Sequence, residues 1–255
     1  ATVSSQYATA LALLSATGAE FELDLGKGPL ASGPYFEMTL ALLGEAGVAI
    51  DRGETSLRFG PTAALHQPCI LNPETDASSA AVWAMAELVG VEAHVARPPT
   101  TGRQPDARAA YFAHELANAH RTGLEGLVIE LDESPDLAPV LVAVATQIDP
   151  RVDIVGAAHL RHKESDRIGD LAQAFARIGI LVEPREDGLH IPRGRQEATA
   201  DALFPTHGDH RLAMAALLAS AQTSSLRIEA PMVVAKSYPD FWHHARRLGW
   251  SVTPT

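Results

Sequence analysis

The sequence predicts an α/β protein built from a repeated unit of helix, strand, strand, helix and strand. Stretches with helical periodicity alternate with short extended stretches along the chain, which is typical of this fold class. The spacing of key residues also repeats, because Gly47 and Asp76 are 29 positions apart and Gly179 and Asp209 are 30 positions apart. A chain of 255 residues that is 46% hydrophobic is long enough for one large domain or two modest ones.

The first copy of the unit begins with a helix that ends near Gly47, because glycine is favoured where a helix terminates. Residues 51–59 then have the pattern of a hairpin, and Asp76 opens a second helix over residues 77–88. An aspartate suits that position because its carboxylate accepts hydrogen bonds from the first free N–H groups of a helix. Residues 91–96 complete the copy as an extended segment.

The last copy follows the same order. Its first helix ends at Gly179, and its hairpin covers residues 183–191. Asp209 opens a helix over residues 210–221, which leads to an extended segment at 226–229. A unit of this length that recurs along a chain indicates a repeat architecture.

A shorter copy lies between these two. Residues 107–119 have the pattern of its first helix, and residues 126–131 that of a strand. Asp136 opens its second helix over residues 137–146, and a further extended segment follows. Only 13 positions separate Gly123 from Asp136, so we expect this copy to lack its hairpin.

Composition argues against several classes of function. The formal charge of −11 argues against nucleic acid as a partner, since proteins that bind it usually carry a basic face. No stretch approaches 18 consecutive apolar residues, so we expect no membrane-spanning segment. Cys69 is the only cysteine and cannot form an internal disulfide. Together with the lack of a secretory signal pattern, this favours the cytoplasm.

The first residues of the chain are unusual for a complete protein. Ala1–Gln6 lead into a helix predicted over residues 7–14, and no methionine stands at the start. We therefore expect this chain to have been cut from a longer one, with a processed terminus as the alternative.

Three charged segments carry the chemistry that the sequence suggests. They are Arg161–Arg167, Gly208–Met214 and Ala235–Phe241. Each places one to three cations at the edge of an apolar stretch, and an acidic protein has little structural reason to repeat that pattern. A site that holds phosphorylated anions and moves protons would explain it.

The first two segments each admit a functional and a structural interpretation. Lys163 and Arg167 are four positions apart and would share one face of a helix, where they could bind an anion while Glu164 moves a proton. Arg211 and His210 would bind an anion at the start of the helix that Asp209 opens. The alternatives are a solvated helix start with ion pairs in the first segment and an ordinary capped helix in the second.

Two other helix starts also admit both interpretations, and for Ser4–Gln6 taken alone the structural one is favoured. Asp136 either caps a helix or projects its carboxylate into a cleft, where it could take a proton from a substrate hydroxyl. Ser4, Ser5 and Gln6 either cap a helix or form a phosphate cradle.

No metal ion or organic cofactor is expected. His159 and His162 are three positions apart, as are His207 and His210, but no carboxylate or cysteine completes a recognisable set of ligands. Neither a Walker loop nor a dinucleotide-binding fingerprint is present.

Taken together and in this order, the polar segments of the chain resemble those of the EPSP synthase family. The segments are Ser4–Gln6, Ser32–Tyr35, Asp76–Ser79, Pro135–Asp136, Leu160–Arg167, Asp209–Met214 and Ala235–Phe241. The resemblance covers essentially the whole chain. Its specific parts are Lys163–Arg167 and Asp209–Arg211, whereas the serine motifs are common in other proteins.

The resemblance implies the two-domain enolpyruvyl transferase fold. This fold is an inside-out α/β barrel in which each domain holds three copies of the unit and the two domains close over a cleft. Residues 1–73 would then be the last unit of the N-terminal domain, and residues 74–255 the C-terminal domain. The rest of the N-terminal domain would be the missing partner of this chain, which we otherwise expect to be a monomer.

The reaction of the family transfers the enolpyruvyl group of phosphoenolpyruvate to the 5-hydroxyl of shikimate 3-phosphate and releases phosphate. It is a step of the shikimate pathway of aromatic amino-acid biosynthesis. Two phosphates and two carboxylates must be held side by side, so the site needs several cations. The hydroxyl must lose a proton, and the methylene carbon must gain one and later lose one, so two acid/base groups are needed.

The resemblance also implies roles for individual residues. Asp136 would be the base at the substrate hydroxyl, Glu164 would handle the proton on carbon, and His210 and Lys236 would assist proton transfer and phosphate departure. The residues that would hold shikimate 3-phosphate are Ser4, Ser5, Gln6, Ser32, Tyr35, Asp136, His159 and Lys163. The residues that would hold phosphoenolpyruvate are Gln6, Arg167, Arg211 and Lys236.

The chain departs from the family pattern in two respects. His159 stands where the family usually has asparagine as a substrate contact, and His162 stands where it usually has valine, so protonation of His159 would make binding sensitive to pH. The Lys-Ser pair, arginines and glycine-rich loop of the family's first domain are also absent, so we expect the chain alone to lack appreciable turnover.

Two other functions stay open at this point. One is an enzyme like the UDP-N-acetylglucosamine enolpyruvyl transferase, which shares the fold and the chemistry. The other is a non-catalytic phosphate-binding module. Asp136 and Glu164 argue against the second, because an inert binder needs the cations but not the two acids.

Overall fold

The computed structural model describes residues 5–28, 30, 32–62, 73–93, 95, 102–163 and 166–253. The chain divides into two compact units, which we call unit 1 and unit 2. Unit 1 comprises residues 1–74 with 101–105, and unit 2 comprises residues 75–100 with 106–255. Each unit has a hydrophobic core of its own.

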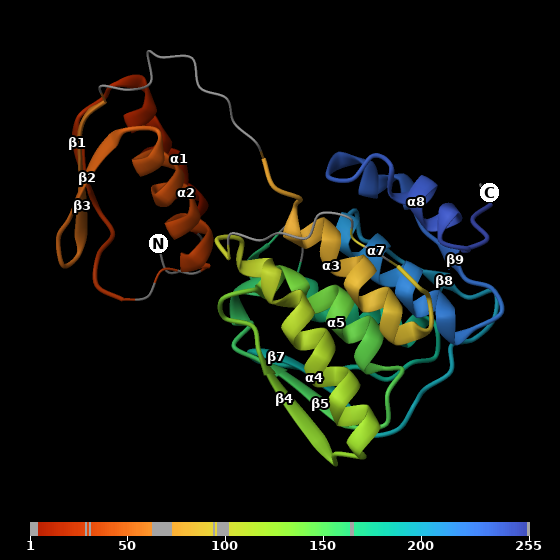
Figure 1. The fold of residues 1–255 in the computed structure, drawn as a ribbon. Coiled ribbons are helices and arrows are strands. Elements are labelled where there is room, and N and C mark those ends of the chain that lie inside the picture. The colour runs from red at the N-terminus through yellow and green to blue at the C-terminus, as the bar shows by residue number, and fades with distance from the viewer. Residues whose placement is uncertain are drawn as a thin grey trace. The chain divides into compact units, whose positions relative to one another are not determined.

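Unit 1 packs two helices against a small antiparallel sheet (Figure 1). The helices are α1 (Gln6–Leu14) and α2 (Gly33–Glu45), and a 3₁₀ turn, η1 (Ser15–Thr17), follows α1. The strands β1 (Phe21–Asp24), β2 (Val48–Arg52) and β3 (Ser56–Thr62) pair in the order β1-β3-β2. Pairing of β2 with β3 confirms the hairpin predicted at residues 51–59, and Phe36 and Phe59 lie together in the core.

The described residues of unit 2 form two sheets. The larger has the strands β4 (Gly126–Glu130), β5 (Arg151–Val155), β7 (Gly188–Ile191) and β6 (Glu183–Arg185), in that spatial order. Strands β4 and β5 are parallel, and the other neighbours are antiparallel. The smaller sheet pairs β8 (Leu203–Phe204) with β9 (Arg227–Ile228) in parallel.

The helices of unit 2 alternate with these strands along the chain. The α-helices are α3 (Ala77–Ala86), α4 (Ala109–Thr122), α5 (Ala138–Ala145), α6 (Arg167–Arg177), α7 (His210–Ala219) and α8 (Phe241–Arg247). The 3₁₀ turns are η2 (Glu87–Val89), η3 (Pro105–Arg108), η4 (Pro135–Leu137), η5 (Ala158–His162), η6 (Ser220–Gln222) and η7 (Pro231–Lys236).

Three helices, α3, α5 and α7, contact one another at the centre of unit 2 (Figure 1). Every residue of α5 is buried, as are seven residues of α3 and nine residues of α7. A helix that is apolar on all sides belongs in a core, and alanine, valine and leucine supply most of these surfaces. The polar groups of these helices are therefore concentrated at their ends, which limits where a polar site can form.

The structure confirms that the middle copy of the unit lacks a hairpin, and it corrects the prediction of one extended segment. Only one strand, β4, lies between the end of α4 at Thr122 and the start of η4 at Pro135, a stretch that the structure describes throughout, so this copy has no hairpin. The extended segment predicted at residues 91–96 is wrong for the residues described there, since 91–93 and 95 belong to no strand. The N–H of Val91 instead donates to the carbonyl of Ala86 and closes the end of the preceding helix, with Gly90 in the left-handed conformation.

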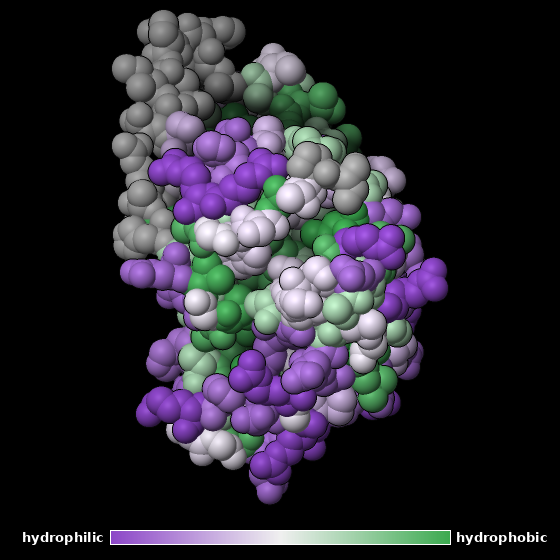
Figure 2. Space-filling model, turned by 90° about the vertical axis from the view of Figure 1, so that its right-hand side faces the viewer, coloured by the Kyte–Doolittle hydropathy of each residue, from purple (hydrophilic) through white to green (hydrophobic). Residues whose placement is uncertain are grey.

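The surface is mixed in polarity. Figure 2 shows hydrophilic residues spread over one face of the molecule, with hydrophobic residues between them. Within the part of the chain that the structure describes, no helix has both the length and the apolar character needed to cross a membrane.

Candidate active site

Aspartates cap three helices of unit 2, and each accepts hydrogen bonds from backbone N–H groups in the first turn. Asp76 accepts from Ser78 N at 2.8 Å and from Ser79 N at 3.2 Å in α3. Asp166 accepts from Gly169 N at 3.2 Å in α6, and Asp209 accepts from Arg211 N at 2.8 Å in α7. These bonds satisfy donors that a helix start leaves without intrahelical partners.

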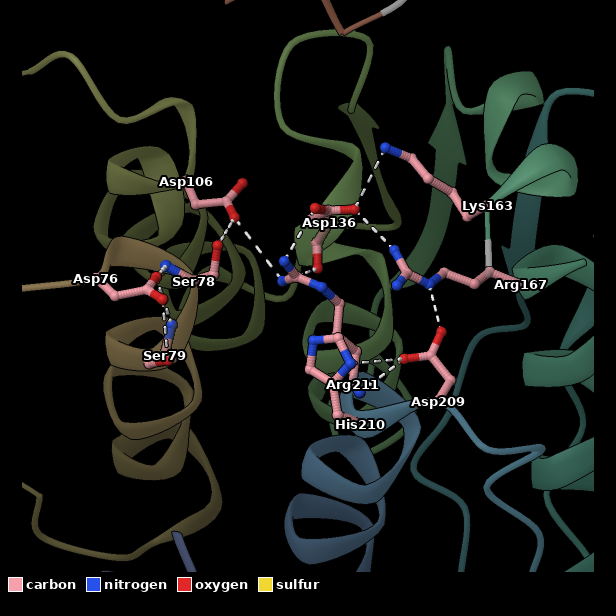
Figure 3. Close-up of polar contacts among 10 residues, drawn as sticks. All are labelled: Asp76, Ser78, Ser79, Asp106, Asp136, Lys163, Arg167, Asp209, His210 and Arg211. Carbon is pink, nitrogen blue, oxygen red and sulfur yellow. Dashed lines mark hydrogen bonds and ion pairs between the residues drawn. The ribbon is translucent and has the colours of Figure 1, made fainter. Parts of the chain in front are cut away.

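Asp136 lies in η4, directly before the buried helix α5, and three cations surround its carboxylate (Figure 3). Arg167 Nη1 lies 2.7 Å from Oδ1, and Arg211 Nη2 lies 2.9 Å from Oδ2. Lys163 Nζ lies 3.7 Å from Oδ1, and Arg211 Nη1 also donates to the backbone carbonyl of Asp136 at 3.2 Å. The sequence separations of 27, 31 and 75 positions show that folding alone brings these groups together.

Arg167 joins the fully buried carboxylate of Asp209 to the partly buried carboxylate of Asp136. Its Nη1 bonds Asp136, while its Nε donates to Asp209 Oδ2 at 2.6 Å. The Arg167 side chain is 3% exposed and that of Asp209 is fully buried. Buried charges persist in a folded protein only when they are paired and hydrogen-bonded, and the Arg167 guanidinium meets that condition on two sides.

The charges of this cluster shift the pKa of Asp136 and of its neighbours. Burial by itself would raise the pKa of Asp136, but Arg211, Lys163 and Arg167 outweigh it and lower that pKa from 3.8 to about 2. Burial acts against the charged form of Arg167 as well, and Asp136 and Asp209 nevertheless raise its pKa. Burial and the charge of Lys163 lower the pKa of His159. At neutral pH Asp136 is therefore ionised and His159 is neutral.

The structure places the cation pair of the first charged segment differently from the prediction. We predicted that Lys163 and Arg167 share a helix face, and this is wrong. Turn η5 ends at His162, Lys163 has a non-helical backbone conformation, and α6 begins only at Arg167 after its Asp166 cap. The two cations still reach the same carboxylate, because they approach Asp136 from a loop and from a helix start.

The remaining site residues that the sequence predicted lie in several places. In unit 1, Ser5 is buried at the start of α1 with Gln6 next to it, while Ser32 precedes α2 in the left-handed conformation and Tyr35 lies in that helix. In unit 2, His159 lies in η5, His210 opens α7 and Lys236 ends η7. The predicted residues Ser4 and Glu164 lie outside the described residues.

The sequence reasoning missed two residues next to the cluster. Asp106 is 1% exposed and lies 3.9 Å from Arg211 Nη1 through Oδ2, and Ser78 Oγ donates to that same carboxylate (Figure 3). A signal was present, because Pro105 and Asp106 precede a predicted helix just as Pro135 and Asp136 do. No group of three or more histidine, cysteine or acidic side chains suited to a metal ion occurs among the described residues.

Comparison with known proteins identifies the family. Residues 1–244 match the model of the EPSP synthase family, described as 3-phosphoshikimate 1-carboxyvinyltransferase. The chain belongs to the EPSP synthase family. The 3-phosphoshikimate 1-carboxyvinyltransferase of Methanopyrus kandleri is 32% identical to it, over 97% of this chain and 59% of the relative. The enzyme of the same name from Pseudomonas savastanoi pv. phaseolicola gives the same three values.

Solved structures confirm the predicted fold class. An EPSP synthase from Acinetobacter baumannii has a TM-score of 0.67 at 22% identity, covering 91% of this chain and 57% of that one. The enolpyruvyl transferase NikO from Streptomyces tendae also has a TM-score of 0.67, at 17% identity, covering 98% of this chain and 60% of that one. The chain thus has the enolpyruvyl transferase fold and spans about 59% of the length of the two relatives named above.

Proposed function

We propose that this chain, within the polypeptide that its organism makes, transfers the enolpyruvyl group of phosphoenolpyruvate to the 5-hydroxyl of shikimate 3-phosphate and releases phosphate. The observation that supports this most is the cluster of Lys163, Arg167 and Arg211 around one carboxylate, Asp136. Family membership and the names of the relatives agree with it.

The cations of the cluster suit the substrates. Phosphoenolpyruvate brings a phosphate and a carboxylate to the site, and shikimate 3-phosphate brings another of each. We propose that Arg167 and Arg211, with Lys236 and Gln6, hold phosphoenolpyruvate, because a guanidinium can bind such groups through two parallel hydrogen bonds. Lys163 would hold shikimate 3-phosphate, together with Ser4, Ser5, Gln6, Ser32, Tyr35 and His159.

The proposed reaction has a defined proton balance. The 5-hydroxyl oxygen bonds to C2 of phosphoenolpyruvate while Asp136 takes the hydroxyl proton and Glu164 delivers a proton to C3. Loss of a proton from C3 then restores the double bond as the C2–O bond to phosphate breaks, with His210 and Lys236 assisting. The products are the enolpyruvyl ether and inorganic phosphate.

The low pKa of Asp136 fits this scheme if the bound substrates change its surroundings. A carboxylate with a pKa of about 2 is ionised but is a weak base. Anionic groups of the substrates would compete with Asp136 for Arg167, Arg211 and Lys163. A weaker hold of these cations on Asp136 raises its pKa, because less positive charge then favours its ionised form.

We also propose that further polypeptide completes the site. Residues 1–73 would belong to a first domain and residues 74–255 to a second, with the rest of the first domain as the partner of this chain. Helix α1 supports this, since Tyr7, Leu11 and Leu14 form an exposed apolar stripe at helical spacing. The chain alone would then lack appreciable turnover, and the whole protein would act as a monomer in the cytoplasm.

The experiment that tests this function is a turnover assay. The polypeptide as the organism makes it is mixed with phosphoenolpyruvate and shikimate 3-phosphate, and ³¹P NMR follows the release of inorganic phosphate and the new ether. We expect release only when both substrates are present, and no release when UDP-N-acetylglucosamine replaces shikimate 3-phosphate. Release with the nucleotide sugar alone as acceptor would favour the sister transferase, and binding of both substrates without release would favour a non-catalytic module.

A further inference from the structure

We propose that Asp106 is a positioning residue that holds the guanidinium of Arg211 in the orientation needed to bind an anion. The identity of that anion, phosphoenolpyruvate, rests on the proposed function. The positioning itself rests on contacts within unit 2.

Asp106 is a buried carboxylate that the start of another helix contacts. It lies in η3, before α4, and only 1% of it is exposed. The Ser78 hydroxyl, in the first turn of α3, donates to its Oδ2. Ser78 is itself fixed, because its backbone N–H donates to the capping carboxylate of Asp76 at 2.8 Å. The start of α3 therefore holds Asp106 in one position.

The guanidinium of Arg211 lies between two carboxylates (Figure 3). Asp136 Oδ2 is 2.9 Å from its Nη2, and Asp106 Oδ2 is 3.9 Å from its Nη1. Its Nε is buried and has no hydrogen-bond partner among the described residues. The orientation of the group thus depends on contacts at its two terminal nitrogens, and Asp106 and Asp136 approach these from different elements.

The carboxylates of Asp106 and Asp136 have different roles in the proposed reaction. Asp136 also pairs with Arg167 and Lys163, and in the proposed reaction it gains a proton and loses its charge during each turnover. A neutral Asp136 attracts Arg211 less strongly. Asp106 takes no part in proton transfer in this scheme, so its charge stays available to hold Arg211 throughout the cycle.

A role of Asp106 in recognising a separate ligand has less support. Asp106 lies at the edge of a cavity of about 390 Å³ between α3 and α4. Alanine side chains such as Ala80, Ala84 and Ala113 make up most of that lining. They offer few polar groups that could fix the orientation of a ligand, whereas the contact with Arg211 places Asp106 at the cation cluster.

The first test measures the mobility of Arg211 directly and needs no activity. In protein labelled with ¹⁵N-arginine, exchange of the two Nη groups by rotation reports how firmly a guanidinium is held, and the Arg211→Lys variant assigns the signal. We expect Asp106→Asn to speed this exchange about tenfold, since it removes the charge of a buried carboxylate 3.9 Å from Arg211 Nη1 and so weakens the attraction that holds the guanidinium. Unchanged exchange in Asp106→Asn would overturn the proposal.

A second variant and a control exclude a merely structural role. Ser78→Ala removes the hydroxyl that fixes Asp106 but keeps the charge, so a smaller acceleration in the same direction is expected. Asp201→Asn is the matched control, because Asp201 also accepts from a serine, Ser225 Oγ at 2.6 Å, but is exposed and not in contact with the cluster. If Asp201→Asn accelerates Arg211 exchange as much as Asp106→Asn does, the proposal is wrong.

The kinetic test separates this proposal from the proposed function. In the polypeptide as the organism makes it, loss of the Asp106 charge in Asp106→Asn should raise KM for phosphoenolpyruvate about tenfold and change KM for shikimate 3-phosphate less than about twofold. Equal increases in both KM values would contradict a specific effect on Arg211. A wild-type protein that turns over neither substrate would refute the proposed function, while the ¹⁵N measurement would still decide the role of Asp106.

Discussion

At the scale of single residues, Arg167 is the group on which the cluster depends most. It bonds Asp136 and Asp209 at the same time, and its side chain and that of Asp209 are almost completely buried. A buried ion pair stabilises a fold less than its short distances suggest, but removal of one partner leaves the other buried and unpaired. Loss of Arg167 would leave the buried Asp209 without its guanidinium partner, whereas Asp136 would keep Arg211 and Lys163.

Replacement of Arg167 by leucine should therefore lower the free energy of unfolding by about 3–5 kcal/mol. Urea unfolding at pH 7 measures this change. The matched control is Arg185→Leu, because Arg185 pairs with Glu183 at 2.7 Å on the surface, where such pairs contribute about 0–1 kcal/mol. Similar losses in the two variants would show that the buried cluster is not held together by Arg167.

The depressed pKa of Asp136 predicts a specific loss of stability in acid. The folded-state pKa is about 2 and the ordinary value is 3.8, so the stabilisation is present above pH 4 and is lost as pH falls toward 2. The shift corresponds to about 2 kcal/mol. Between pH 4 and pH 2 the wild type should therefore lose about 2 kcal/mol more unfolding free energy than Asp136→Asn does, because the variant has no carboxyl group to titrate at this position. Parallel pH profiles for the two proteins would contradict a depressed pKa at Asp136.

At the scale of elements, the ends of the buried helices create the site. Helices α3, α5 and α7 are apolar along their lengths, and their polar groups gather where they begin. The N-terminal end of a helix carries a partial positive charge from its aligned peptide dipoles, which favours nearby anions. Asp136, directly before α5, and Asp209, at the start of α7, benefit from this field, as would a bound phosphate.

The two capping aspartates Asp76 and Asp209 should respond differently to replacement by asparagine. Asparagine caps a helix about as well as aspartate, so Asp76→Asn should change the unfolding free energy by less than about 0.5 kcal/mol. Asp209→Asn also removes the charge that pairs with buried Arg167, and should cost about 2 kcal/mol or more. Thermal and urea unfolding of the two variants measure both effects, and equal losses would mean that Asp209 acts only as a cap.

The sequence predicted the elements well where local signals decide them. Glycine and aspartate at helix ends located α3, α4, α5 and α7, and the spacing of Gly123 and Asp136 predicted the missing hairpin. The prediction at 91–96 was wrong for the residues described there, because an apolar extended pattern does not show whether a neighbouring strand is available for pairing. The predicted helical position of Lys163 was wrong because α6 begins only at Arg167, after its Asp166 cap.

The composition of the cluster could be predicted only in part. Asp136, Lys163, Arg167 and Arg211 were found because charged residues stand at the edges of apolar stretches. The direct contacts among them join positions far apart in the chain and depend on how the helices pack. The local signal at Pro105 and Asp106 marks a helix start, but it does not reveal the contact of Asp106 with Arg211, 105 positions further along the chain.

At the scale of the whole molecule, the chain consists of two units with separate cores, and the cation cluster belongs to unit 2. The predicted substrate contacts Ser5, Gln6, Ser32 and Tyr35 belong to unit 1. The chain spans about 59% of the length of the two relatives named above, and Tyr7, Leu11 and Leu14 of α1 are exposed. Turnover should therefore be measured on the polypeptide as the organism makes it.

The most direct measurement compares Asp136→Asn with the wild type in phosphate release, alongside calorimetric titration with shikimate 3-phosphate and phosphoenolpyruvate. The Asp153→Asn variant is the control, since Asp153 pairs with Arg151 and His190 on the larger sheet. We predict that Asp136→Asn loses turnover by about 100-fold or more while both substrates still bind, and that Asp153→Asn keeps its activity. Turnover by Asp136→Asn within a few fold of the wild type would contradict the assignment of this cluster as the site of enolpyruvyl transfer.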